Sequence, residues 1–120
     1  MLLGTLGKNF AENATAISAG SMKITFFEPH VLAAPFKHFD VVSQDKVEVA
    51  WETSAYWFEK DPAFALFSSV PFGPDAPEFM AWMKHGGGGK LRDELYEPYG
   101  LVSIICGAQP ELLPGIRTLT

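Results

Sequence analysis

Hydrophobic residues recur along the chain with two different spacings, which predict helices that alternate with strands. Apolar residues at every third or fourth position predict helices over residues 8–19 and 36–44. Alternating apolar and polar residues predict strands over residues 22–27 and 47–51, and the apolar run 101–106 predicts a third strand buried on both faces. Strands separated by helices favour an α/β fold with a mainly parallel sheet flanked by helices.

Two helix starts in the second half of the chain carry capping residues. Asp61 followed by Pro62 has the pattern of an N-cap with proline at the first helical position, which predicts a short helix through Phe67. Asp75 and Glu78 have the spacing of a capping box and predict the start of a longer helix. This second helix carries its apolar residues at helical spacing, so we expect one of its faces to be buried.

Four consecutive glycines, residues 86–89, should end that helix, because each glycine inside a helix costs about 1 kcal/mol relative to alanine. A further helix is predicted over residues 90–96. The glycine run followed by Lys90 could pass for a phosphate-binding loop. The Walker A pattern, however, needs a glycine and a serine or threonine at the positions that hold Lys84 and Leu91 here. We therefore interpret the run as a turn between two helices.

Length and charge narrow the classes of partner. The chain has 120 residues, fourteen acidic and nine basic, and a formal net charge of -5. This balance argues against nucleic acid, because phosphate neutralisation needs clustered lysine and arginine. No apolar run approaches the roughly 18–20 residues that span a bilayer, and residues 1–4 are too short for a secretory signal peptide. We expect a single domain.

Residues that could perform catalysis or bind a metal form no recognisable group. The single cysteine, Cys106, permits no internal disulfide and no cysteine-based metal cage, and its apolar flank should raise the thiol pKa. His30, His38 and His85 are too scattered for a metal-binding motif. The carboxylates likewise identify no acid–base pair. We therefore expect no enzyme, no metal site and no cofactor.

An aromatic cluster with a hydroxyl group, residues 54–58, follows the second predicted strand. In open α/β sheets, ligands bind at the carboxyl ends of the strands, and small-molecule sites are mostly apolar with a few polar groups. From these residues alone two interpretations stay open. The aromatic side chains either pack in the core or line a ligand site.

Short sequence blocks occur in a characteristic order along the chain. They are Phe10–Asn13, Ser18–Gly20, Lys23-Ile24, Pro35-Phe36, Phe39–Ser43, Ser54–Trp57, Lys60–Phe67, Val70–Gly73, Ala81-Trp82, His85–Gly88, Glu94–Tyr96 and Pro98–Leu101. Together they resemble the solute-binding proteins of TRAP transporters, the DctP-like family, over about residues 7–107. The blocks are most similar to the branch that handles 2-oxo acids and related monocarboxylates.

The resemblance implies a periplasmic-binding-protein-like lobe that is incomplete, with its first strand and the second lobe missing. Residues 1–107 would form this partial first lobe, and residues 108–120 a divergent tail. The implied function is that of a truncated substrate-binding component of a TRAP-type system for small organic carboxylates, such as 2-oxo acids or C4-dicarboxylates. The implied location is the periplasm, and the implied partners are the TRAP membrane permease subunits.

The resemblance also assigns candidate ligand-binding residues: Ser54, Tyr56 and Trp57 would face the ligand, and Phe36 would lie on the same cleft wall. A carboxylate is held by a bidentate arginine and by two lobes that exclude water. One lobe alone should therefore bind carboxylates weakly or not at all. The alternative is a non-binding remnant stabilised by self-association, because unpaired sheet edges and apolar patches drive association.

Overall fold

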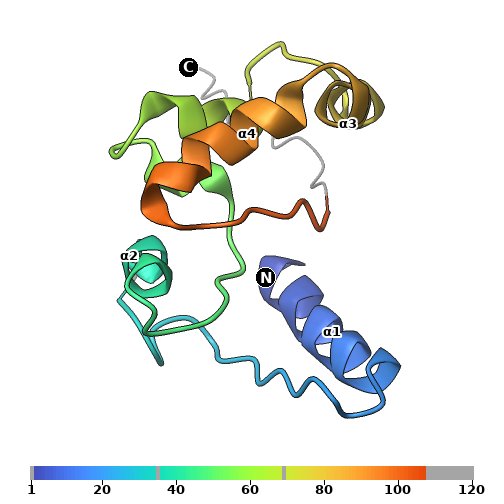
Figure 1. Cartoon of the computed structure of the whole chain (residues 1–120), viewed down its shortest axis with the longest axis vertical. Coiled ribbons are helices and arrows are strands. Elements are labelled where there is room, and N and C mark those ends of the chain that lie inside the picture. The colour runs from blue at the N-terminus through green and yellow to red at the C-terminus, as the bar shows by residue number, and fades with distance from the viewer. Residues whose placement is uncertain (1, 35, 69, 108–120) are drawn as a thin grey trace, which may run out of the picture.

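The computed structural model describes residues 2–34, 36–68 and 70–107, and this part of the chain consists of helices joined by long irregular segments (Figure 1). The α-helices are α1 (Leu2–Ile17), α2 (His38–Ser43), α3 (Ala76–His85) and α4 (Gly88–Tyr96). Short 3-10 helices are η1 (Ser54–Trp57), η2 (Pro62–Phe67) and η3 (Glu97–Tyr99). The predicted tail, residues 108–120, lies outside the described residues.

The capping signals in the sequence are confirmed by the structure. Asp75 precedes α3, its carboxylate accepts a hydrogen bond from the backbone N–H of Glu78, and the Glu78 side chain accepts one from the N–H of Asp75. Asp61 precedes η2 and accepts a hydrogen bond from the N–H of Ala63 at 2.8 Å. The helix that follows Asp61 is a 3-10 helix throughout.

The prediction of three strands has to be corrected, because none of them is present in the described part of the chain. No backbone hydrogen bond joins residues 22–27, 47–51 and 101–106 to one another there. A strand needs a neighbour that pairs with its N–H and C=O groups. Figure 1 shows the first segment running between α1 and α2, apart from the third, which crosses beneath α4. The mainly parallel sheet is therefore not confirmed.

Aromatic side chains from five elements form the core. Phe64 of η2 is completely buried, and its ring centroid lies 5.5 Å from Phe39 of α2 and 5.0 Å from Tyr96 of α4. The ring centroid of Phe39 also lies 5.1 Å from that of Trp57 in η1 and 4.9 Å from that of Tyr99 in η3. Most of these pairs meet edge to face, which is the favourable arrangement of aromatic rings. The cluster thus joins segments that are far apart in sequence.

Helix α1 packs separately, against the segment that follows it. Gly7 is buried there, and the Phe26 ring lies so close that a Cβ at this position would come within 2.6 Å of it. One helical turn later, Phe10 lies 5.2 Å from Trp51. An ion pair at 2.5 Å between Lys8 and Glu28 closes the edge of this contact. The radius of gyration, 16.1 Å, exceeds the roughly 13–14 Å of a compact chain of this length, so the arrangement is open.

The four glycines were predicted to form only a turn, but two of them belong to the following helix. Gly86 ends α3 and Gly87 has a positive φ of 88°, but Gly88 and Gly89 form the first turn of α4. The reason is packing: a Cβ at Gly88 would lie 2.6 Å from the Trp82 indole. The glycine allows α4 to start directly on the aromatic ring of α3.

A mostly buried ionisable pair joins α2 to the segment before η1. The Nδ1 atom of His38 contacts Oε1 of Glu52, and their side chains are 24% and 14% exposed. The second carboxylate oxygen of Glu52 is buried without a hydrogen-bond partner in the described part of the chain. Burial raises the pKa of Glu52 above its ordinary value of 4.5, and the attraction of His38 offsets this only in part.

Truncation of the central ring should destabilise the whole chain. Phe64→Ala removes the one large side chain that is completely buried among the described residues, and we expect a loss of about 3–5 kcal/mol in the free energy of unfolding, measured in urea. The matched control is Phe72→Ala, because Phe72 is fully exposed and its loss should change stability by less than about 0.5 kcal/mol. Equal effects of the two substitutions would contradict the proposed core.

Alanine should have opposite effects at a glycine that packs between α3 and α4 and at a glycine with open space around it. Gly88→Ala places a methyl group against Trp82 and should cost about 1–3 kcal/mol through overpacking. Gly4→Ala lies in α1 with nothing within 4 Å of the new Cβ, so it should stabilise the chain by up to about 1 kcal/mol. Thermal melts of the two variants measure both effects. A neutral Gly88→Ala variant would show that α4 does not need this close approach.

The pair of His38 and Glu52 predicts how stability depends on pH. Because the folded chain holds the Glu52 proton more tightly than the unfolded chain does, the contribution of Glu52 is fully present below pH 4.5 and is lost as the pH rises through the raised pKa. Glu52→Gln should therefore match the wild type below pH 4.5 and be more stable at neutral pH. Urea unfolding on both sides of pH 4.5 tests this. A less stable variant at neutral pH would mean that the attraction of His38 outweighs burial.

Candidate functional site

The two residues before α2 and its first turn form one wall of an open cleft of about 740 Å³, and η1 with the turn after it forms the other. Phe36, Lys37 and Asp40 line one wall, and residues 55–60 line the other. Both walls lie next to the aromatic core, because Phe39 lies between Lys37 and Asp40 of the first wall and Trp57 belongs to the second. The cleft is thus built where two distant segments meet.

Phe36 and Tyr56 are brought together at this cleft. Their ring centroids lie 5.3 Å apart with an interplanar angle of 88°, and the side chains remain 61% and 39% exposed. Phe36 has a positive φ of 59°, a backbone conformation that is costly for a bulky residue and that tends to occur at functional sites. The structure therefore presents two exposed rings in contact, and it holds one of them on a strained turn.

The other two predicted ligand residues lie deeper. Trp57 is only 6% exposed and packs against Phe39, so it forms the floor beneath the cleft. Ser54 does not line the cleft, and its hydroxyl oxygen is buried with no hydrogen-bond partner in the residues that the structure describes. Of the four predicted residues, the structure thus gathers Phe36 and Tyr56 on an accessible surface and turns Trp57 and Ser54 inward.

Charged residues on the cleft walls were not anticipated from the sequence. Lys60 Nζ lies 2.5 Å from Asp40 Oδ1 and 5.1 Å from the centroid of the Phe39 ring. The hydrogen bond from Lys60 lowers the pKa of Asp40 below its ordinary value. Lys37 lies 3.8 Å from the other oxygen of Asp40 and is 67% exposed. The spacing of Lys37 and Asp40 in the sequence was a usable signal, whereas the approach of Lys60 depends on the fold.

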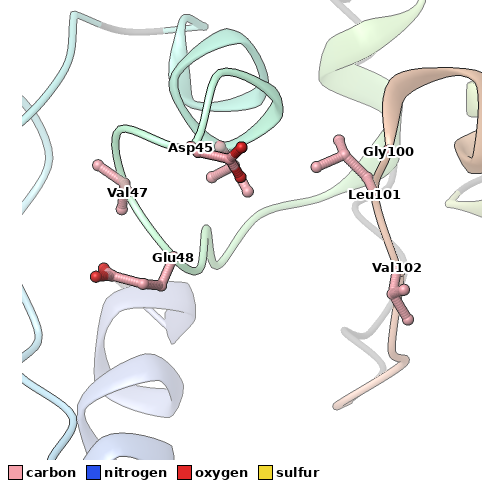
Figure 2. A pocket seen from close by; sticks show the side chains of 7 residues that line it. Asp45, Val47, Glu48, Gly100, Leu101 and Val102 are labelled. Carbon is pink, nitrogen blue, oxygen red and sulfur yellow. The ribbon is translucent and has the colours of Figure 1, made fainter.

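A second cleft, of about 300 Å³, lies between the turn after α2 and the segment after α4. Figure 2 shows Asp45, Val47 and Glu48 on one side and residues 100–102 on the other. Its lining contains two carboxylates and no basic residue. This composition disfavours an anionic ligand, so the first cleft is the better candidate for a carboxylate.

The described residues contain neither a group of metal-ligating side chains nor a helix that could span a membrane. No three His, Cys, Asp or Glu side chains gather there in a way that could hold a metal ion. None of the helices in this part of the chain is both long enough and apolar enough to cross a membrane. Partial burial raises the pKa of the Cys106 thiol, as its apolar flank predicted.

Comparison with known proteins identifies the family. The family model for bacterial extracellular solute-binding protein, family 7 (DctP), matches residues 2–105. A monocarboxylate 2-oxoacid-binding periplasmic protein of Nostoc sp. is 31% identical over 108 residues, which are 88% of this chain and 30% of that protein. The match confirms the resemblance that the sequence blocks indicated.

Solved structures of two TRAP periplasmic solute-binding proteins are similar to this chain. The protein from Pseudoalteromonas atlantica, solved with bound sodium and pyruvate, is 34% identical with a TM-score of 0.77. The protein from Colwellia psychrerythraea, solved with bound calcium and pyruvate, is 31% identical with the same TM-score of 0.77. Each alignment covers 82% of this chain and 30% of the known structure.

The chain thus spans about 30% of the length of the relatives that it matches. The family and the Nostoc relative are named for the solutes that they bind. The similarity in fold holds although the described residues contain no strand. This chain belongs to family 7 of the bacterial extracellular solute-binding proteins.

Proposed function

We propose that residues 1–107 form part of the first lobe of a TRAP-type solute-binding protein, and that their role is to contact a small organic carboxylate. The ligand would be a 2-oxo acid or a C4-dicarboxylate, captured in the periplasm and passed to the TRAP membrane permease subunits. The observation that carries this proposal is the exposed pair of Phe36 and Tyr56 on an open cleft beside Lys37.

The relatives support this class of ligand. Two similar structures contain pyruvate, and the Nostoc protein is named for monocarboxylate 2-oxoacids. Because this chain covers about 30% of those proteins, the contribution that we propose for it is one wall of a binding site.

The chemistry of the cleft suits a small planar anion. The two aromatic rings provide apolar surface for the carbon skeleton, as is typical of small-molecule sites. Asp40 is held most closely by Lys60 at 2.5 Å, which leaves Lys37, at 3.8 Å, the more available ammonium group for a ligand carboxylate. Glu59 also lines the cleft, and its carboxylate would repel an anionic ligand. We therefore expect the ligand carboxylate to lie near Lys37 and the two rings.

We expect binding by this chain to be weak. The cleft is open, and Phe36 keeps 61% of its surface in contact with solvent. Water therefore screens the charge of Lys37 and competes for the carboxylate. We expect a dissociation constant of about 1 mM, which corresponds to about 4 kcal/mol of binding free energy.

A thermal melt with pyruvate tests the proposal. A ligand that binds only the folded chain stabilises it by about 1.4 kcal/mol when present at about ten times its dissociation constant, which corresponds to a rise of about 5–10 °C for a chain of this size. Tyr56→Ala should abolish the rise, because it removes half of the exposed aromatic pair. Phe72→Ala, which removes an exposed ring outside the cleft, should retain it.

Acetone serves as the control ligand, because it has a ketone and no carboxylate. Pyruvate, but not acetone, should raise the melting midpoint, and Lys37→Met should reduce the difference between them. The proposal fails if pyruvate leaves the midpoint unchanged at concentrations well above 1 mM. It also fails if Tyr56→Ala and Phe72→Ala respond to pyruvate equally.

A further inference from the structure

We propose that Asp40 is a specificity-determining residue of the 740 Å³ cleft. Its carboxylate occupies the place beside Lys60 that the second carboxylate of a dicarboxylate ligand would take. The cleft should therefore accept monocarboxylates and disfavour dicarboxylates. This inference rests on the proposed function, and it narrows the class of ligand to molecules that carry a single carboxylate.

The charges that line the cleft cancel one another. Lys37 and Lys60 supply two ammonium groups, and Asp40 and Glu59 supply two carboxylates. The chain as a whole has a net charge of -5, so it adds no attraction for anions. A monoanion needs one ammonium group from this wall. A dianion needs a second one, and it also brings a second negative charge close to the two carboxylates.

Asp40 lies between the two ammonium groups. Its Oδ1 atom accepts a hydrogen bond from Lys60 at 2.5 Å, and its Oδ2 atom lies 3.8 Å from the Nζ atom of Lys37. Two ammonium groups that converge on one carboxylate are a typical anion-binding arrangement, and here a side chain of the protein already occupies it. Because Lys60 makes the shorter contact, Lys37 alone is left for a ligand.

Both partners of the short contact are held in place. The hydrogen bond from Lys60 lowers the pKa of Asp40, so the carboxylate stays charged at neutral pH. Lys60 has a second support, because its Nζ atom lies 5.1 Å from the centroid of the buried Phe39 ring and is attracted by the ring face. We therefore expect Lys60 to stay on the cleft wall when Asp40 loses its charge, and Asp40→Asn should free its ammonium group for a ligand.

Partial exposure limits the size of the effect. The side chains of Lys60 and Asp40 are 32% and 29% exposed, so water screens their charges. Interactions between charges at such sites change an equilibrium by up to about fivefold. We expect the dissociation constant of a dicarboxylate to exceed that of a matched monocarboxylate by about two- to fivefold.

NMR titrations of the full chain with two ligands test this preference. The ligands are 2-oxopentanoate and 2-oxoglutarate, which share a five-carbon 2-oxo acid skeleton and carry one and two carboxylates. The wild type should bind 2-oxopentanoate more tightly. Asp40→Asn should abolish or invert the preference, because it removes a competing carboxylate and releases Lys60.

Lys60→Met is the matched control, because it breaks the same ion pair but leaves the negative charge of Asp40 in the cleft. This variant should keep the preference for 2-oxopentanoate or increase it. The two substitutions thus have opposite effects on the ratio of the two dissociation constants. If the ion pair only supported the fold, both substitutions would change the ratio in the same way, and that result would overturn the inference.

Salt provides a second measurement that needs no substitution. At an ionic strength of about 1 M the Debye length falls to about 3 Å, so the preference of the wild type should nearly disappear in potassium chloride at that concentration. A wild type that binds 2-oxopentanoate, but binds 2-oxoglutarate equally well or better, would overturn this inference and leave the proposed function intact. A wild type that binds neither ligand would overturn both.

Discussion

The contact on which the structure depends is the packing of Phe39 among the aromatic rings of three other elements. Phe39 lies 5.1 Å from Trp57, 5.5 Å from Phe64 and 4.9 Å from Tyr99, and Lys60 lies over the same ring. These contacts fix α2 against η1, η2 and η3. Because edge-to-face aromatic pairs have a defined geometry, they set the positions of neighbouring residues as well as burying area. The cleft is a consequence of this arrangement.

Each wall of the cleft is made by a residue next to a buried ring. Burial of Phe39 places Asp40 beside it, where Lys60 can reach the carboxylate at 2.5 Å. In the same way, burial of Trp57 leaves Tyr56 on the outside of η1, where it meets Phe36. The core therefore decides which aromatic residues can face a ligand. A family resemblance that names a whole motif cannot make this distinction, whereas the packing separates Tyr56 from Trp57.

Local sequence signals predicted the helices well, and long-range contacts account for the differences. The capping box of Asp75 and Glu78 involves residues three positions apart, so the sequence contains all of it. Strands depend on a partner elsewhere, and in the described part of the chain residues 22–27, 47–51 and 101–106 have none. The ion pair of Asp40 and Lys60 and the seat of Gly88 on Trp82 also depend on the fold. Of the site, the aromatic pair was predictable, but its charged surroundings were not.

The segment 101–107 is fixed on one face by the same aromatic core. Its inner side gains burial from the core through Leu101, whose N–H donates to the carbonyl of Tyr96. Its outer residues Val102 and Ile104 keep most of their surface exposed in the described part of the chain. The core thus determines which side chains lie outside in two places: Tyr56 lies outside because its neighbour Trp57 is buried, and Val102 lies outside because its neighbour Leu101 packs on the core.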